Sequence, residues 1–336
     1  MKISLKEYEL QLKHTFRISR DSYNTRSTLV VSIDHEGKTG YGEATSHSYY
    51  NSTVSGMMAE IETVRETLET TAFETPEIFY ELLKDLNLSN FARCALDLAA
   101  NDLYGKLKNT PLYTLWGTCL EKYPLSNYTI GIGSIDEMAG KIKEKPWPVY
   151  KIKLGTSQDL KIIKELRKHT NAVFRVDANC AWTVAETIAI APKLKKLGVE
   201  FIEQPLNAYD WEGMKKVKEK CVLPVIADES CVVEADVARC VPCFTGINIK
   251  LVKCGGLTPA RRMIANARAC GLKVMAGCMT ESSVGISALA QLIPQLDYVD
   301  MDGAMLLKKD IAKGVKINDD GTVSFPSLGG SGVNLL

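Results

Sequence analysis

The chain has 336 residues, and because domains usually span about 100–200 residues, we expect two domains or one large barrel with an appendage. Hydrophobic residues make up 46% and charged residues 24%, close to the average of globular proteins, which argues against a disordered or fibrous chain. The 41 basic and 40 acidic side chains leave a net charge of +1, so the chain has no overall field for binding nucleic acid or an anionic membrane.

The sequence also lacks the signals of membrane and secreted proteins. No apolar run reaches the ~18 residues of a spanning helix, and the N-terminus interleaves charges where a signal peptide needs an unbroken apolar stretch. We therefore expect a cytoplasmic protein whose ten cysteines are mostly reduced. Cys240 and Cys243 form a Cys-x-x-Cys pair, which we interpret as structural thiols, with a metal or redox role as the alternative.

Residues 1–118 follow a pattern of strands and then helices. Alternating apolar residues predict strands over 5–12 and 27–33, and a third strand-like run follows a turn at 35–38 and ends at Ala44. Apolar positions then recur at helical spacing over 54–70 and 76–106. This order is typical of an α+β domain.

Residues 119–307 instead alternate short β-rich runs with helical stretches. From the second run onward, the polar residues at the run ends recur 22 to 28 residues apart, the length of a strand, a crossover helix and two loops. Eight such runs predict a (β/α) barrel, with a doubly wound open sheet as the alternative. The runs cover 128–133, 149–153, 173–177, 199–203, 225–228, 247–250, 273–278 and 298–302.

Three consecutive predicted strands end in carboxylates. Asp177, Glu203 and Asp228 would converge on one arc of the barrel mouth, where three neighbouring negative charges repel unless a cation lies between them. Oxygen ligands without His or Cys indicate Mg²⁺, with Mn²⁺ as a substitute. The alternative is that each carboxylate only caps the helix that follows it.

Lysines end two other strands. Lys151 and Lys153 are two residues apart, so both point to one face of the second barrel strand, and neighbouring ammonium groups lower the pKa of at least one of them. Lys250 ends the sixth strand, which lies opposite the second in an eight-stranded ring. A substrate between them would have a base on each face, although a barrel lysine can also be a structural partner for a carboxylate.

This constellation resembles the enolase superfamily, in particular its muconate-lactonizing-enzyme-like subgroup. The resemblance implies a modified (β/α)7β barrel and an α+β capping domain, formed by residues 1–118 and completed by the tail 308–336. It further implies that Asp177, Glu203 and Asp228 bind Mg²⁺, that Lys153 and Lys250 are acid/base residues, and that Lys151 tunes Lys153. The matching motifs are Lys151-Ile-Lys153, Val176-Asp177-Ala178-Asn179, Ile202-Glu203-Gln204-Pro205, Ala227-Asp228-Glu229-Ser230 and Ile249-Lys250.

The end of the eighth strand indicates the substrate. Asp300 and Asp302 place two carboxylates on one face, a suitable anchor for an ammonium group, although they could also cap a helix. This Asp-x-Asp is similar to the motif of dipeptide epimerases, which bind the α-amino group of the substrate there, and the segment with Cys278 and Thr280 resembles their seventh strand end. The last histidine is His169, so no His base can come from strands six or seven, as in the mandelate-racemase-like branch.

The resemblance therefore implies an epimerase that inverts Cα of the C-terminal residue of a dipeptide, with L-Ala-D/L-Glu as the leading substrate and cell-wall peptide recycling as its role. Arg17, Arg20 and Arg26, expected in a loop between the first two strands, are candidates for binding a distal carboxylate. A cycloisomerase, a succinylbenzoate-synthase-like lyase and a catalytically silent binding barrel remain alternatives. The sequence leaves open whether the chain forms a homo-oligomer.

Overall fold

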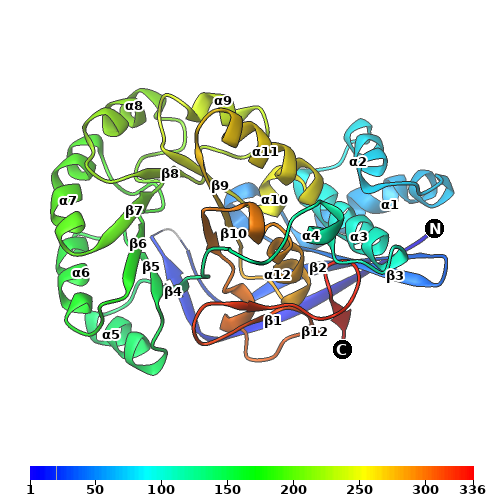
Figure 1. Ribbon diagram of the computed structural model, residues 1–336, viewed down its shortest axis with the longest axis horizontal. Coiled ribbons are helices and arrows are strands. Elements are labelled where there is room, and N and C mark those ends of the chain that lie inside the picture. Colours follow the sequence, from blue (N-terminus) through cyan, green and yellow to red (C-terminus); the bar gives the residue numbers. More distant parts are fainter. Residues whose placement is uncertain (20) are drawn as a thin grey trace.

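The computed structural model describes residues 1–19 and 21–336, and an eight-stranded parallel sheet forms a barrel at one end of it (Figure 1). A parallel bridge between Ser126 and Val299 brings the first and last strands together. All eight predicted strands are present, four of them slightly shorter than expected. In chain order around the barrel they are β4 (Tyr128–Ile130), β5 (Val149–Lys153), β6 (Val173–Asp177), β7 (Val199–Glu203), β8 (Val225–Ala227), β9 (Gly246–Ile249), β10 (Lys273–Gly277) and β11 (Tyr298–Asp300).

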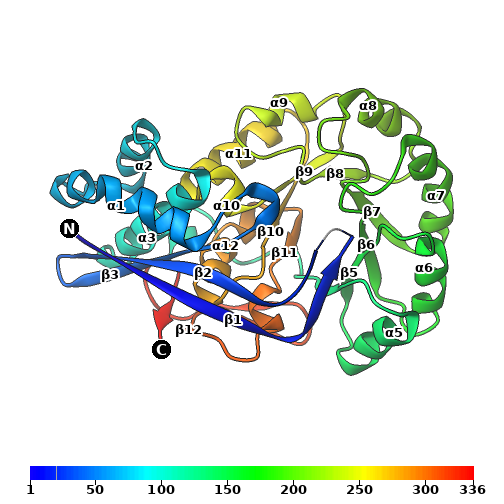
Figure 2. The ribbon, with the colours of Figure 1, turned by 180° about the vertical axis from the view of Figure 1, so that it is seen from behind.

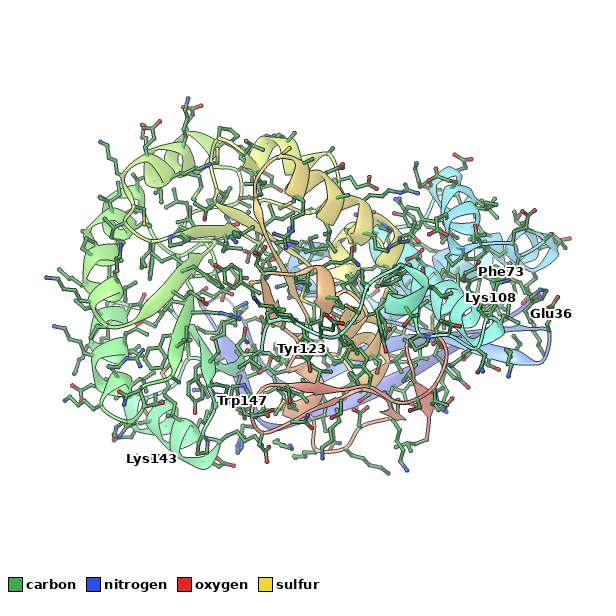
Figure 3. All side chains as sticks on the ribbon, viewed as in Figure 1. Glu36, Phe73, Lys108, Tyr123, Lys143 and Trp147 are labelled. Atoms are coloured by element: carbon green, nitrogen blue, oxygen red, sulfur yellow. The ribbon has the colours of Figure 1, made fainter. Side chains whose placement is uncertain are left out.

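Helices between the strands form an outer ring, and side chains fill the space between the two layers (Figure 3). Ser134 and Thr183 each begin a helix with a capping box. The hydroxyl accepts a hydrogen bond from the backbone N–H of a glutamate three residues later, and the side chain of that glutamate accepts one from the backbone N–H of the capping residue. The fold is therefore the predicted (β/α)7β barrel. The helices are α5 (Ile135–Glu144), α6 (Asp159–Arg167), α7 (Val184–Lys196), α8 (Trp211–Lys220), α9 (Asp236–Cys240), α10 (Leu251–Cys254), α11 (Leu257–Ala269) and α12 (Ser283–Ala290).

A three-stranded antiparallel sheet and four helices precede the barrel. The strands are β1 (Lys2–Ile18), β2 (Asp21–His35) and β3 (Lys38–Thr45), and the helices are α1 (Val54–Thr70), α2 (Pro76–Asp85), α3 (Asn90–Leu107) and α4 (Leu112–Leu115). Gly42 allows β3 to lie directly on α3, because a Cβ there would be 2.0 Å from the carbonyl oxygen of Ala95. The stretch 76–106, predicted to be helical, contains the two helices α2 and α3.

The hairpin of β1 and β2 is much longer than predicted and extends from the capping sheet to the barrel mouth (Figure 2). The backbone N–H of Ile132, which follows β4, donates to the carbonyl of Arg17 at 2.9 Å. Leu12 in β1 forms an antiparallel bridge with Leu307 behind the last barrel strand. The expected loop carrying Arg17 and Arg26 is therefore wrong, because both residues lie in paired strands.

The C-terminal segment returns to the capping helices. Both the backbone N–H and the hydroxyl of Ser331 donate to Asp102 of α3 at 2.8 Å, and Lys106 of the same helix donates to the carbonyl of Val333. The segment contains the short strands β12 (Ala312–Lys313), β13 (Lys316–Ile317), β14 (Val323–Ser324) and β15 (Asn334–Leu335). Three 3-10 turns lie earlier in the described chain: η1 (Ser48–Tyr50), η2 (Ile293–Gln295) and η3 (Gly303–Leu306).

No disulfide joins any of the ten cysteines, all of which lie in the described residues. Cys240 is fully buried, and both a hydrogen bond with Cys231 and burial raise its pKa, while the Cys243 thiol donates to the carbonyl of Trp211. Among the helices of the described chain, none combines the length and apolar character that crossing a lipid bilayer requires.

Candidate active site

The carboxyl ends of the barrel strands bring the predicted polar residues to one mouth. Lys153, Asp177 and Glu203 are the last residues of β5, β6 and β7, and Asp228 and Lys250 directly follow β8 and β9. All five side chains are buried. Because parallel barrel strands end on the same face, residues separated by up to a hundred positions lie in one cluster.

The three carboxylates form the centre of this cluster. One oxygen of each of Asp177, Glu203 and Asp228 lies within 4.8 Å of the others. Glu203 accepts a hydrogen bond from Asn248 on Oε1, and its Oε2 lies 2.8 Å from the Lys151 ammonium. Burial and then the charge of Asp177 raise the pKa of Glu203 to about 7. A buried, closely spaced set of hard oxygen donors fits a divalent cation such as Mg²⁺ or Mn²⁺.

Lys151 is a bridge between these carboxylates and the end of β11. Its ammonium lies 3.2 Å from Asp177, 2.8 Å from Glu203 and 2.7 Å from Asp300. Burial opposes its charge, but the three carboxylates outweigh burial and hold the pKa of Lys151 well above its ordinary value. Of the two neighbouring lysines, Lys151 is therefore not the one with the lowered pKa that the pairing predicted, and its side chain stays charged.

Lys153 and Lys250 lie on opposite sides of the ring, since three strands separate β5 from β9 in either direction. Lys153 donates to Asp177 Oδ2 at 2.7 Å and Lys250 to Asp228 Oδ2 at 2.8 Å. Both side chains line the cavity at the barrel mouth. Burial lowers the pKa of Lys250, but Asp228 outweighs burial and the net pKa is raised.

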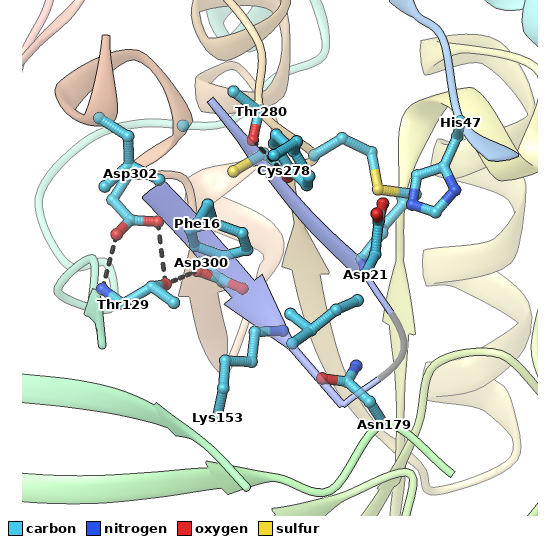
Figure 4. A pocket seen from close by; sticks show the side chains of 16 residues that line it. Phe16, Asp21, His47, Thr129, Lys153, Asn179, Cys278, Thr280, Asp300 and Asp302 are labelled. Carbon is cyan, nitrogen blue, oxygen red and sulfur yellow. Dashed lines mark hydrogen bonds between the residues drawn. The ribbon is translucent and has the colours of Figure 1, made fainter. Parts of the chain in front are cut away.

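Asp300 and Asp302 line the same cavity but differ in their partners. Asp300 accepts from Lys151 and from the amide of Asn127, each at 2.7 Å. Burial opposes its ionisation, but Lys151 outweighs burial and lowers the pKa of Asp300 to about 2. Asp302 accepts from the backbone N–H of Thr129 at 2.6 Å and from its hydroxyl at 3.1 Å (Figure 4).

No basic side chain in the described part of the chain forms an ion pair with Asp302. Burial, and then the charge of Asp300, raise the pKa of Asp302 to about 7. A carboxylate with 2% exposure on a cavity wall and no cation beside it is suited to a cationic ligand group. The alternative of a helix-capping pair is not observed, since the side chain of Asp302 caps no backbone N–H of η3.

The cavity lies between the ends of the barrel strands and the β1–β2 hairpin. The β1–β2 hairpin covers it with Phe16, Ile18, Asp21 and Tyr23, and His47 closes a further side (Figure 4). Cys278 and Thr280 line the cavity after β10, as the resemblance implied. The hydroxyls of Tyr23 and Thr280 lie 2.8 Å apart, so a hydrogen bond joins the hairpin to the barrel.

Two of the three candidate arginines do not line this cavity. Arg26 pairs with Asp21 at 3.3 Å and stacks on Tyr23. Arg17 lines a separate groove with Glu137. Arg20 lies outside the described residues, so its role as a carboxylate ligand stays a prediction.

The sequence analysis did not identify the residues that form hydrogen bonds with the predicted carboxylates. Asn127 and Thr129 hold Asp300 and Asp302, Asn248 holds Glu203, and Lys253 donates to Asp228 Oδ1 at 2.7 Å. Asn248 carried a detectable signal, because it precedes Lys250 by two residues and so faces the barrel interior as Lys250 does.

Comparisons with known proteins agree with this geometry. The chain matches the models "Mandelate racemase / muconate lactonizing enzyme, N-terminal domain" over residues 2–117 and "Enolase C-terminal domain-like" over residues 134–336. An L-Ala-D/L-amino acid epimerase of Maribacter sp. is 65% identical over 100% of this chain and 99% of its own length.

Two solved structures share the architecture. A substrate-liganded complex of the L-Ala-D/L-Glu epimerase from Bacillus subtilis has a TM-score of 0.93 and 27% identity over 99% of both chains. A dipeptide epimerase from Enterococcus faecalis complexed with Mg and the dipeptide L-Leu-L-Tyr has a TM-score of 0.91 and 27% identity over 99% of this chain and 98% of that chain. The barrel with its capping sheet, the carboxylate triad at the strand ends and these matches show that the chain belongs to the mandelate racemase/muconate lactonizing enzyme family within the enolase superfamily.

Proposed function

We propose that the protein is a dipeptide epimerase that inverts Cα of the C-terminal residue, with Asp177, Glu203 and Asp228 as the ligands of one Mg²⁺. The observation that carries the proposal is a cavity lined by Lys153 and Lys250, from opposite sides of the ring, and by Asp302, which pairs with no basic side chain of the described residues. The relatives named as L-Ala-D/L-amino acid, L-Ala-D/L-Glu and dipeptide epimerases support the same reaction class.

The Cα proton beside a carboxylate is very weakly acidic, so its removal needs a fixed positive charge near the carboxylate oxygens. A divalent cation held by the triad would stabilise the charge that develops on the substrate carboxylate. Lys151 adds a positive charge within 3.2 Å of two carboxylates of the triad, Asp177 and Glu203. Because three acceptors hold its ammonium, we assign Lys151 to charge stabilisation and not to proton transfer.

The two opposed lysines account for inversion. A Cα between Lys153 and Lys250 presents its hydrogen to one amine, and the other ammonium lies on the opposite face to return a proton. The lysine that takes a proton in one direction donates it in the reverse direction. Removal of a proton from one face of Cα and addition of a proton to the other face is a 1,1-proton transfer, and no group leaves the substrate.

Asp302 supports a substrate with a free amine. Asp302 follows β11, which is four strands from β7 and therefore opposite Glu203 of the triad. A substrate whose carboxylate lies at the triad must extend across the barrel mouth for its other end to reach Asp302. A dipeptide places its α-ammonium at that end. Cycloisomerase and succinylbenzoate-type substrates have no ammonium group, and a buried carboxylate without a cation would only disfavour them.

The side-chain preference is broader than L-Glu in this proposal. The hairpin that covers the cavity contributes Phe16, Ile18 and Tyr23. Arg26 of the same hairpin forms an ion pair with Asp21. These contacts favour apolar and aromatic residues at the epimerised position, with acidic residues dependent on Arg20. A part in cell-wall peptide recycling follows only if L-Ala-D/L-Glu is among the good substrates.

The test is a dipeptide library incubated with the protein and Mg²⁺ in D₂O and read by mass spectrometry. We expect one deuterium per molecule at the C-terminal Cα of L-Ala-X dipeptides, together with appearance of the L,D epimer on chiral chromatography. Excess chelator is the control for metal dependence. Deuterium incorporation without epimer formation, or no incorporation into any dipeptide, would contradict the proposal.

A further inference from the structure

We propose that Asn248 is a positioning residue of the metal site, and that Gly277 on the neighbouring strand lacks a side chain so that Asn248 can hold Glu203. This inference rests on the metal site of the proposed function and concerns two residues to which the sequence analysis gave no role. Neither residue lines the cavity, so neither is placed to touch the substrate.

Asn248 orients one carboxylate of the triad. It lies in β9, has 0% exposure, and donates from Nδ2 to Glu203 Oε1 at 2.8 Å. The second oxygen, Oε2, lies 2.8 Å from the Lys151 ammonium. The amide therefore holds one oxygen and fixes the other toward the centre of the triad, where a cation would bind.

The backbone of Asn248 reaches a second ligand. Its carbonyl accepts from Lys253 Nζ at 3.2 Å, and the same ammonium donates to Asp228 Oδ1 at 2.7 Å. Lys253 has 1% exposure and also donates to the carbonyl of Cys231. Glu203 and Asp228 are thus both tied to one residue of β9, which limits how far the two carboxylates can separate.

Gly277 provides the space that this arrangement needs. A Cβ at Gly277 would lie 2.8 Å from both Nδ2 and Oδ1 of Asn248 and 3.2 Å from its Cγ, and these are the three nearest atoms. The backbone of Gly277 does not have a positive φ angle, so its conformation is open to other residues. The constraint is therefore steric: an alanine would push the amide away from Glu203.

Partners that orient metal ligands typically change metal affinity about 10–100-fold when they are removed. The experiment measures Mg²⁺ binding by isothermal titration calorimetry without substrate, in the full-length wild type, Asn248→Ala, Gly277→Ala and the double variant. We expect Mg²⁺ to bind about 10-fold more weakly to each single variant. Because Gly277→Ala acts only by displacing the amide, the double variant should bind Mg²⁺ no more weakly than Asn248→Ala alone.

Asn101→Ala is the matched control. Asn101 is also a buried asparagine, but its amide donates to Asp97 and Thr258 between α3 and α11, away from the triad. Thermal unfolding in EDTA reports the structural cost of each variant. We expect Asn101→Ala to lower the unfolding temperature and leave the Mg²⁺ dissociation constant unchanged.

The inference is overturned if Asn248→Ala binds Mg²⁺ within twofold of the wild type, or if the effects of the two substitutions add in the double variant. If Asn248→Ala does not fold, Gly277→Ala retains the test, since an affinity within twofold of wild type in that variant also refutes the role. Failure of the proposed function gives a different result. A protein that lacks epimerase activity but shows the expected Mg²⁺ affinities would contradict the proposed epimerase reaction and leave the role of Asn248 in place.

Discussion

Replacing Asp302 with Asn tests whether this carboxylate reads the substrate amine. The substitution keeps the shape of the side chain and removes the one cavity carboxylate that has no cationic partner among the described residues. A hydrogen bond between charged groups typically contributes about 1.5–3 kcal/mol. Since 1.4 kcal/mol corresponds to a factor of ten, kcat/KM for dipeptides with a free amine should fall about 10- to 150-fold.

The comparison substrate is the same dipeptide with an acetylated amine, assayed by deuterium incorporation at Cα. Acetylation removes the positive charge, so Asp302→Asn should change its already low turnover little or raise it. Asp300→Asn is the matched variant, because Asp300 is the charge partner of Lys151. Loss of that partner acts through Lys151 and should reduce turnover of both substrates alike.

The pH dependence provides a second readout for Asp302. Its pKa is raised to about 7 by burial and Asp300, and only the ionised carboxylate attracts an ammonium group. In the wild type, kcat/KM for a free dipeptide should therefore rise as pH increases toward about 7 and then level off. Asp302→Asn should remove this limb. If the limb persists, or if the variant disfavours free and acetylated dipeptides equally, Asp302 does not bind the amine.

Three further predictions concern the metal, the lysines and stability. Chelation should abolish turnover and Mg²⁺ should restore it, and Glu203→Gln should weaken Mg²⁺ binding measured by calorimetry, so full activity in excess chelator would refute the metal assignment. Lys153→Ala and Lys250→Ala should each stop epimerisation, yet each should still exchange the Cα proton of one epimer, and a variant that epimerises at nearly the wild-type rate would refute the two-base reaction. Burial raises the pKa of Asp97 to about 7, above the value near 4 of an unfolded chain, so the unfolded state loses this proton first and the contribution of Asp97 to the free energy of unfolding should fall as pH rises from about 4 to 7. Asp97→Asn should reduce that slope in urea unfolding, and an unchanged slope would show that Asp97 does not titrate there.

The barrel and its ligand-bearing ends could be predicted because each βα unit repeats a local pattern. A strand, a helix and two short loops need about the same number of residues each time, so Asp177, Glu203 and Asp228 recur at nearly equal intervals. The alternation of β-rich and helical runs then determines the order of the strands, and the order places the run ends on one face. Residue type and spacing alone therefore located the triad and the opposed lysines.

The capping strands were harder to predict, because contacts with the barrel support the pairing of their outer halves. β1 continues to Ile18 and β2 begins at Asp21, although charged side chains interrupt the apolar alternation there. The hairpin is held by contacts such as the Tyr23–Thr280 hydrogen bond, between residues 257 positions apart. No local pattern contains such a contact, so Arg17 and Arg26 were placed in a loop.

The sequence by itself determined which residue types stand at the strand ends, and the tertiary structure decided what each one contacts. Asp300 and Asp302 looked equivalent in sequence, yet Lys151, two strands away in the ring, pairs with Asp300, whereas no basic side chain of the described residues pairs with Asp302. The spacing of Lys151 and Lys153 predicted a lowered pKa for at least one of them, but for Lys151 three carboxylates from β6, β7 and β11 raise it. These differences depend on distances between strands that are far apart in the chain, and charge interactions fall off with distance in space and not with separation in sequence.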